Sequence, residues 1–156
     1  MEDLTLELKY ARCGYDELDD TLRGLCDAAK AATAGSYSPY SGFSVGAAVL
    51  LENGTVITGS NQENVAYPSG LCAERNALFA AGHRYPDIPV AALAVAALSN
   101  GQFTEQPVTP CGACRQVLSE TARRYGRSVK VVLYGRSGCI VIENGADVLL
   151  PFSFDF

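Results

Sequence analysis

Hydrophobic and polar positions along the N-terminal part of the chain predict a strand followed by a helix. Leu4–Tyr10 alternates between apolar and polar residues, which is typical of a strand. The helix is expected to start at Asp19 or Asp20, either of which can cap it, and to end at Gly35. Its apolar residues share one helical face. They are Leu18, Leu22, Leu25, Cys26 and Ala29.

The middle of the chain predicts a hairpin, a helix and a buried strand. Asn53-Gly54 separates the apolar runs Val45–Leu51 and Thr55–Ser60, and Asn-Gly in this position favours a two-stranded hairpin. Cys72–Ala81 is rich in alanine and predicts a helix that ends at Gly82. Val90–Leu98 is apolar throughout and predicts a buried parallel strand.

The C-terminal part adds another helix and two strands. The helix is expected to run from Pro110 to Tyr125, with Gly126 just past its end. Its predicted apolar stripe consists of Ala113, Val117, Leu118, Thr121 and Ala122. Val129–Tyr134 and Cys139–Ile142 predict neighbouring strands. Together the elements indicate a layered α/β sandwich on one mixed sheet.

Length and charge narrow the class of protein. The chain has 156 residues, so we expect a single domain over residues 1–156, with residues 1–19 as an extra N-terminal segment. Twelve Lys and Arg against seventeen Asp and Glu give a net charge of −5, which argues against a nucleic-acid partner. No apolar run reaches the length of a membrane span, and the acidic N-terminus lacks the order of a signal peptide. We therefore expect a cytoplasmic protein without a membrane partner.

Two short segments carry the residues of a metal centre. They are Cys72-Ala73-Glu74 and Pro110-Cys111-Gly112-Ala113-Cys114. Three protein ligands and an open fourth position are typical of catalytic zinc, whereas a structural site uses four. The helix pattern predicts that the three sulfurs of Cys72, Cys111 and Cys114 meet in front of two helix starts. The partial positive charge at those helix ends favours thiolates.

Charged neighbours of this cluster suggest further roles. Glu74 is a candidate to accept and donate protons at a metal centre, although a first-turn glutamate also simply favours the helix dipole. Arg75 could offset the charge of three thiolates, and so could Arg115, unless they are ordinary surface residues. His83, the only histidine, is interpreted as a surface residue.

The remaining cysteines allow a different interpretation of the chain. Six cysteines could form three disulfides, but that would need an oxidising compartment and usually a smaller, loop-rich chain. We expect Cys13, Cys26 and Cys139 to be small hydrophobic residues of the core.

Several ordered motifs lie along the chain. They are Ser38–Ser41, Phe43–Ala48, Asn61–Asn64, Tyr67–Arg75 and Pro110–Gln116. In their order and spacing they resemble the cytidine deaminase family, and specifically its small, homotetrameric branch with three cysteines. The similarity extends from about Asp20 to Phe154, and nothing is transferred to the residues before it. The resemblance implies a three-layer α/β/α sandwich on a mixed, mostly five-stranded sheet.

The resemblance also implies an activity and its machinery. The activity is hydrolytic deamination of cytidine and deoxycytidine in pyrimidine salvage, with one Zn²⁺ per subunit on Cys72, Cys111 and Cys114. Glu74 would move protons from the zinc water to ring N3 and then to the departing amine. Arg75 would compensate charge.

The expected substrate contacts come from the same resemblance. Asn61 and Glu63 would bind the ribose 3′-hydroxyl, Phe43 would pack on the base, and Tyr40 lies in the same aromatic loop. Ala73 would offer backbone groups to the base. Phe154 would reach into the active site of a neighbouring subunit in a homotetramer.

Three alternatives differ from this reading. A related enzyme could act on an aminonucleoside antibiotic or on a base within RNA or DNA. A non-catalytic zinc module would use the metal only to join two helix starts. A redox protein would form a reversible Cys111–Cys114 disulfide without stoichiometric metal.

Overall fold

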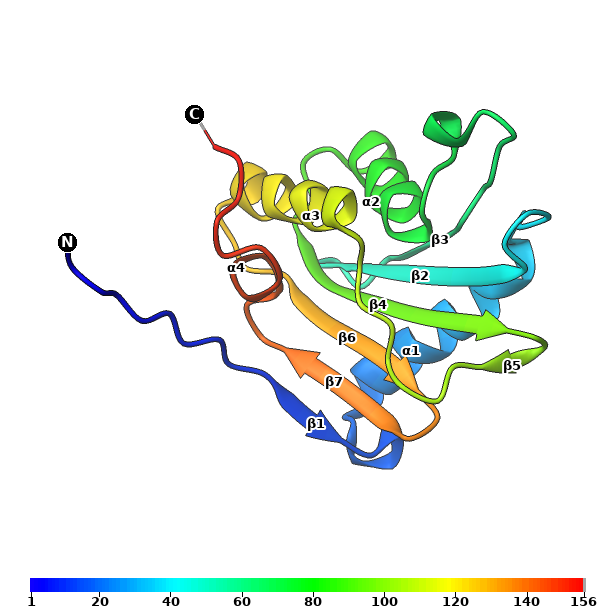
Figure 1. Ribbon diagram of the computed structural model, residues 1–156, viewed down its shortest axis with the longest axis horizontal. Coiled ribbons are helices and arrows are strands. Elements are labelled where there is room, and N and C mark those ends of the chain that lie inside the picture. Colours follow the sequence, from blue (N-terminus) through cyan, green and yellow to red (C-terminus); the bar gives the residue numbers. More distant parts are fainter. Residues whose placement is uncertain (156) are drawn as a thin grey trace.

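The computed structural model describes residues 1–155, which form a mixed seven-stranded sheet with helices on both faces (Figure 1). The strands are β1 (Ala11–Cys13), β2 (Phe43–Leu51), β3 (Val56–Ser60), β4 (Val90–Ser99), β5 (Gln102–Phe103), β6 (Lys130–Gly135) and β7 (Gly138–Ile142). The helices are α1 (Asp20–Ala32), α2 (Ala73–Arg84), α3 (Gly112–Tyr125) and α4 (Gly145–Leu149), with short 3-10 turns η1 (Tyr15–Glu17), η2 (Thr33–Gly35) and η3 (Tyr67–Ser69). The predicted three-layer sandwich is confirmed. The sheet is wider than expected because β1 and the two-residue β5 add to the five main strands.

The sheet order is β1-β7-β6-β4-β2-β3, with β5 paired to β4. β4 runs antiparallel to β2 and parallel to β6, so the predicted parallel pairing holds on one side of β4 only. A parallel pair needs a long crossover connection, and here that connection carries α3. The crossover places α3 beside α2 on the same face of the sheet (Figure 1).

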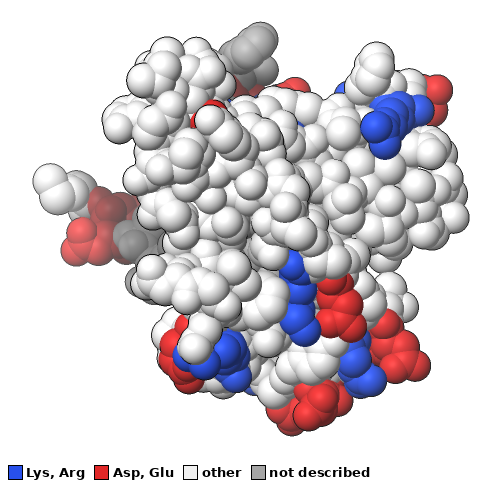
Figure 2. Space-filling model, turned by 90° about the vertical axis from the view of Figure 1, so that its right-hand side faces the viewer, with Lys and Arg blue, Asp and Glu red and all other residues white. Residues whose placement is uncertain are grey.

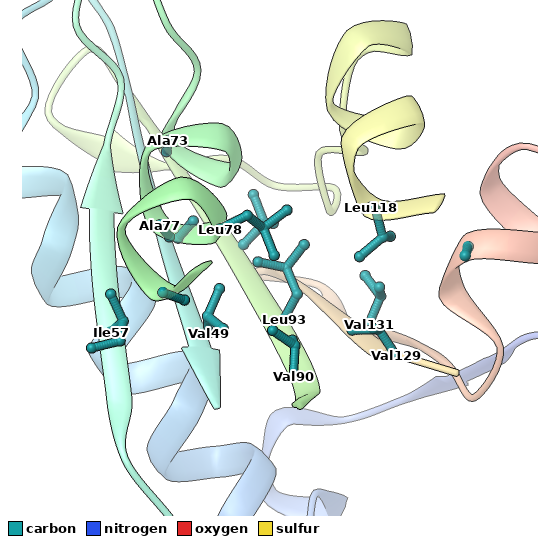
Figure 3. Close-up of a cluster of buried hydrophobic side chains, with 14 of the residues drawn as sticks. Val49, Ile57, Ala73, Ala77, Leu78, Val90, Leu93, Leu118, Val129 and Val131 are labelled. Atoms are coloured by element: carbon teal, nitrogen blue, oxygen red, sulfur yellow. The ribbon is translucent and has the colours of Figure 1, made fainter. Parts of the chain in front are cut away.

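Two hydrophobic clusters form the core, one on each face of the sheet. On one face, α2 and α3 pack on the strands. Ala77 and Leu78 lie near Val49 and Leu93, and Leu118 lies over Val131 (Figure 3). The opposite face packs against α1. β4 serves both clusters because successive side chains of a strand point to opposite faces.

Small residues let α1 lie directly on the sheet. The α1 face of β4 presents three alanines, Ala92, Ala94 and Ala96. On β2, a Cβ atom at Gly46 would lie 2.0 Å from the carbonyl oxygen of Ala29, so only glycine fits there. The predicted start of α1 is confirmed, since the Asp19 side chain accepts a hydrogen bond from the Leu22 amide at 2.8 Å.

The N-terminal strand is the main correction to the predicted elements. The strand spans Ala11–Cys13 and not Leu4–Tyr10, because its partner β7 ends at Ile142, one residue past the partner of Ala11, and offers nothing opposite Leu4–Lys9.

Smaller corrections concern the helices. Gly82 does not end α2, which continues to Arg84, since an isolated glycine is tolerated inside a packed helix. Ala113 is exposed, and Cys114 takes its place on the buried face of α3. The short helix α4 was not predicted. None of the helices within residues 1–155 has the length and apolar character needed to cross a bilayer.

Candidate active site

Three sulfur atoms meet where α2 and α3 begin. Cys72 is the N-cap residue of α2, Cys111 is the N-cap residue of α3, and Cys114 lies in the first turn of α3. The Cys72 and Cys111 sulfurs are 3.7 Å apart, the Cys111 and Cys114 sulfurs are 3.4 Å apart, and all three lie within 4.8 Å of one another. In a tetrahedral zinc site with bonds of about 2.3 Å, two sulfurs are separated by about 3.8 Å. The spacing therefore fits a zinc ion.

The group contains three donors and no fourth within the part of the chain that the structure describes. A closed structural zinc site would use four protein ligands, and a catalytic site uses three. The arrangement therefore leaves one coordination position for water or substrate.

Close backbone packing fixes the first of the two helix starts. A Cβ atom at Gly59 on β3 would lie 2.6 Å from the Ala77 amide nitrogen and 2.7 Å from the Ala73 carbonyl oxygen. The first turn of α2 thus rests directly on β3. Asn76 adds a hydrogen bond from its side chain to the Ser60 carbonyl at 2.7 Å.

The loop that carries Cys111 is fixed by Arg115. Its guanidinium donates to the carbonyl oxygens of Pro110 at 2.7 Å and Leu149 at 3.0 Å, and to the Thr109 hydroxyl at 3.2 Å. These bonds join the start of α3 to the end of α4. The expectation that Arg115 offsets thiolate charge is not supported, because its donors point to this backbone.

Hydrogen-bond donors, one of them the cation of Arg75, surround the sulfur of Cys72. Hydrogen bonds from Cys114, Arg75 and Cys111 outweigh burial and lower the pKa of Cys72 to about 5. The Arg75 guanidinium approaches the Cys72 sulfur at 3.6 Å, where it can compensate charge as expected. The hydrogen bond shared with Cys72 and burial raise the pKa of Cys114. The set thus holds one ready thiolate, and metal binding would displace the remaining protons.

Glu74 lies in the first turn of α2 and is only 5% exposed. It is the only charged residue in the core of the described chain, residues 1–155. Burial raises the pKa of Glu74, and negative charge on Cys72 acts in the same direction. A carboxyl group with a raised pKa beside a metal centre is suited to accept and return a proton near neutral pH.

A cleft of about 470 Å³ opens beside Cys72 and Arg75. Its walls are three chain segments joined by backbone hydrogen bonds. Tyr37 donates to the Asn61 carbonyl at 3.0 Å and accepts from the Glu63 amide at 2.8 Å, and Gln62 and Leu71 exchange two bonds of 2.9 Å. The cleft is lined by Tyr40, Ser41, Asn61, Gln62, Glu63, Asn64, Tyr67, Gly70, Leu71, Cys72 and Arg75.

The side chain of Asn61 is already hydrogen-bonded within the protein. Its Oδ1 accepts from the Ser36 hydroxyl at 2.6 Å and the Val45 amide at 2.7 Å, and its Nδ2 donates to the Phe43 carbonyl at 2.9 Å. Asn61 therefore fixes the entry of β2 beside the cleft.

Glu63 holds the aromatic loop. Its carboxylate accepts from the Tyr40 amide at 2.9 Å, from the Ser41 amide at 3.3 Å and from the Ser41 hydroxyl. The Ser41 hydroxyl and the Tyr40 amide lower the pKa of Glu63. Tyr40 in turn packs edge-on against Tyr67, with ring centroids 6.1 Å apart.

Three other expected contact residues lie outside the cleft lining. Phe43 is the first residue of β2 and is partly buried, and Ala73 is fully buried at the start of α2. Phe154 is 74% exposed on the C-terminal tail. A Gln116 clamp holds that tail, because the Gln116 carboxamide donates to the Phe154 carbonyl and accepts from its amide, both at 3.1 Å.

The sequence pattern did not single out several supporting residues. They are Ser36, Ser41, Asn76 and Gln116. The serines belong to the turn-rich segment Ser36–Gly42, whose density of hydroxyl groups is a signal for side-chain to backbone hydrogen bonds. Asn76 and Gln116 lie on helices and carry no such signal.

The residues assigned no role behave as expected. His83 is exposed on α2. Cys26 and Cys139 are fully buried, Cys13 is partly buried, and all six cysteines are free thiols.

Comparisons with known proteins agree with this geometry. Residues 20–130 match the model of the cytidine and deoxycytidylate deaminase zinc-binding region. A cytidine deaminase from Halalkalibacterium halodurans is 47% identical over 123 residues, which cover 77% of this chain and 83% of that protein.

Solved structures show the same similarity in three dimensions. The crystal structure of cytidine deaminase from Burkholderia pseudomallei superimposes with a TM-score of 0.70 and 39% identity, covering 84% of this chain and 97% of that one. The cytidine deaminase structure from Mycobacterium tuberculosis gives a TM-score of 0.67 and 34% identity, covering 90% and 100% of the two chains.

Proposed function

Because the chain belongs to the cytidine and deoxycytidylate deaminase family of enzymes, we propose that it hydrolyses cytidine and deoxycytidine to uridine and deoxyuridine. Water is consumed and ammonia is released, as in pyrimidine salvage. The observation that carries this proposal is the burial of Glu74 beside three converging sulfurs at the end of an open cleft.

One Zn²⁺ per subunit would be held by Cys72, Cys111 and Cys114. These three sulfurs suit zinc, because thiolates are favoured zinc ligands and the distances between the sulfurs match tetrahedral coordination. When bound, zinc supplies a Lewis acid that lowers the pKa of water toward neutrality.

Glu74 then carries the protons of the reaction. Its carboxylate accepts a proton from the attacking water and delivers it to N3 of the pyrimidine ring. A second proton passes from the nucleophile through Glu74 to the amino group on C4, which leaves as ammonia when the C4–N bond breaks. The raised pKa of Glu74 suits this role, because one group must both take and return a proton.

The cleft would hold the nucleoside by its ribose and its ring. Asn61 and Glu63, which line the cleft, are proposed to bind the 3′-hydroxyl. Phe43 is proposed to pack on the base, with Tyr40 in the same aromatic loop, and Ala73 to offer backbone groups to the base. An ionised carboxylate has about four lone-pair sites, so Glu63 can accept from a ribose hydroxyl in addition to Tyr40 and Ser41. The same carboxylate would repel a phosphate, which favours a nucleoside over a nucleotide.

We also propose a homotetramer with shared active sites, in which Phe154 reaches a neighbouring subunit. Large apolar side chains are exposed around the cleft and on α2, which supports an interface. They are Tyr37, Tyr40, Val65, Tyr67 and Phe79. Figure 2 faces the side where the loop before β2 and η3 lie, and most of that surface carries no charge.

The net charge and the free thiols support the remaining parts of the proposal. A charge of −5 and the carboxylate of Glu63 in the cleft do not suit a nucleic-acid partner. A reducing cytoplasm would keep the three ligand thiols available for zinc.

An assay of the purified protein tests the reaction and its substrate together. Ammonia release is measured on cytidine, adenosine and a cytosine-containing oligonucleotide, with zinc content determined on the same sample. We expect turnover of cytidine with about one zinc per chain. Activity on the oligonucleotide alone would refute the nucleoside assignment. Stoichiometric zinc without turnover would identify a non-catalytic module, and a Cys111–Cys114 disulfide without metal would identify a redox protein.

A further inference from the structure

The N-terminal arm, residues 3–10, extends away from the body of the protein (Figure 1). Its apolar residues alternate with polar ones, so that they share one side of an extended chain. Leu4, Leu6, Leu8 and Tyr10 are 83%, 55%, 45% and 62% exposed. Such a row of exposed apolar side chains is typical of a surface that a partner covers.

The backbone of the arm also lies at the edge of the sheet, where its hydrogen-bonding groups can meet another strand. β1 is the edge strand of the sheet, and Ala11 pairs with Val141 of β7. β7 ends at Ile142, so the arm continues the line of β1 past the end of its neighbour. A strand with unpaired amide and carbonyl groups is a template for another strand.

The arm also forms one wall of a groove. This groove of about 550 Å³ lies between the arm and the region of β7 and α4. Its apolar lining includes Leu6, Leu8, Val141 and Val148. The row of apolar side chains on the arm is therefore continued by apolar side chains of β7 and α4.

We propose that the arm pairs with the same arm of a second copy of this chain, antiparallel and with the two-fold axis at Leu8. In this register Leu8 faces Leu8, Leu6 faces Tyr10, and Glu7 faces Lys9 on both sides of the axis. From Leu6 to Tyr10, both the apolar and the charged positions are then complementary to themselves.

Other registers lack this complementarity. A parallel pair would place Glu7 opposite Glu7, and moving the antiparallel axis to Glu7 or to Lys9 would place like charges opposite each other. An axis between two residues would place at least one apolar residue of the arm opposite a charged residue. An axis at Leu6 would pair Asp3 with Lys9 but would leave the free edge of β1 uncovered. The Leu8 register extends along that edge as far as Arg12, so it joins the two sheets into one.

Cross-linking at the axis tests the pairing. Leu8→Cys would place two sulfurs directly opposite each other, whereas Thr5→Cys is the matched control. In the proposed register two residues at position 5 are separated by about 20 Å, from a rise of about 3.3 Å per residue. Under mild oxidation, we expect Leu8→Cys to give at least about tenfold more covalent dimer than Thr5→Cys, after subtraction of the wild-type background.

Charge reversal tests the register. Lys9→Glu in the Leu8→Cys background should lower the dimer yield by roughly tenfold, because it places like charges opposite each other. Adding Glu7→Lys should restore the yield, while adding Asp3→Lys, which gives the same net charge, should not.

Equal cross-linking at both cysteine positions, or equal rescue by Glu7→Lys and Asp3→Lys, would overturn the proposal. The substituted side chains are exposed, so the fold does not depend on them. The readout is a covalent dimer and not turnover, so its result stands apart from that of the deaminase assay.

Discussion

The carboxyl group of Glu74 has an unusual position for a charged residue. It lies in the core, at the first turn of a helix whose N-cap is Cys72. Burying a carboxylate costs free energy unless a nearby group pairs with it or donates hydrogen bonds to it. A water molecule at the open position of the proposed metal centre would donate a hydrogen bond to this carboxylate, which could then exchange protons with the substrate.

Replacing Glu74 by Gln removes its ability to carry a proton while keeping its size. We expect kcat for cytidine to fall about 10²-fold to 10⁴-fold, with the zinc content unchanged. Glu120→Gln, at an exposed position on α3, is the matched control and should leave kcat unchanged. Wild-type turnover by the zinc-loaded Glu74→Gln variant would refute the proton-transfer role.

Among the site residues, the sequence predicted those that belong to short motifs with fixed spacing. Cys72, Cys111, Cys114 and Glu74 could be placed because metal ligands require particular residue types near helix starts. Their convergence depends on long-range packing, but the sequence spacing already pointed to it. By contrast, the internal bonds of Asn61 connect segments far apart along the chain, which local patterns do not report.

The contact between α2 and β3 sets the position of Cys72. Gly59→Ala would place a Cβ atom against the backbone of Ala73 and Ala77, so α2 would have to shift. We expect a loss of about 1–3 kcal/mol in the free energy of unfolding and weaker zinc affinity. Chemical denaturation and metal competition titrations measure the two effects.

Gly24→Ala is the matched control for this contact. A Cβ atom at Gly24 on α1 meets nothing within 4 Å, so the change should be neutral or slightly stabilising. If Gly59→Ala behaved like Gly24→Ala, the packing of α2 on β3 would not determine the metal centre.

A hydrogen bond between η1 and α1 makes stability depend on pH. The Tyr15 hydroxyl donates to Asp27 Oδ1 at 2.6 Å, which lowers the pKa of Asp27 below its ordinary 3.8 and raises that of Tyr15 to about 12. The stabilisation that ionised Asp27 adds to the free energy of unfolding is complete above its pKa in the unfolded chain. It is lost as the pH falls through its lower pKa in the folded protein. The stabilisation that protonated Tyr15 adds to the free energy of unfolding is complete below pH 10 and is lost as the pH rises toward 12.

Tyr15→Phe should therefore cost about 0.5–1 kcal/mol near neutral pH, a modest value because Asp27 is largely exposed. We expect the cost to shrink as the pH falls below 3.8 and through the lowered pKa of Asp27, where this carboxylate becomes protonated in the folded protein. Tyr125→Phe is the control, since that hydroxyl donates to the Pro86 carbonyl, which does not titrate in this range. Denaturation curves at several pH values would contradict the assignment if both variants responded alike.

The elements that the sequence placed correctly are those with complete local signals. α1 has a capping aspartate and an apolar face, and the β2–β3 hairpin has its Asn-Gly turn. The strand expected at Leu4–Tyr10 was wrong because alternation shows only that a segment suits a sheet. Whether a neighbour is present depends on where β7 ends.

For the whole molecule, the C-terminal tail is the part that links the proposed site to assembly. The Gln116 clamp and an ion pair of 2.6 Å between Arg123 and Asp155 hold the tail along α3. Phe154 is therefore presented from a fixed backbone, as a contribution to a neighbouring site would require.

Phe154→Ala should raise KM for cytidine about tenfold or more while changing kcat less, because the ring would contribute to binding and not to proton transfer. Phe152→Ala on the same tail, at a residue that is 87% exposed, is the matched control and should leave KM unchanged. Steady-state kinetics with sedimentation analysis would exclude the shared site if neither KM nor association changed in Phe154→Ala.

The contacts between subunits were the hardest feature to predict from the sequence. The layered α/β class followed from the order of helices and strands. The use of the exposed apolar residues Tyr37, Val65 and Tyr67 depends on a surface of another chain, which hydrophobic periodicity within one chain does not describe.

Two of the three sulfurs occupy cap positions, where extended backbone turns into helix. Anyone redesigning this scaffold could therefore exchange exposed residues beyond the second turn of either helix, such as His83 and Glu120, with little effect on the donors. Inserting one residue immediately after Cys72 or Cys111 would rotate a sulfur out of the group by about 100° while leaving the hydrophobic interior intact. We expect such a protein to fold and to bind zinc more weakly than the parent chain.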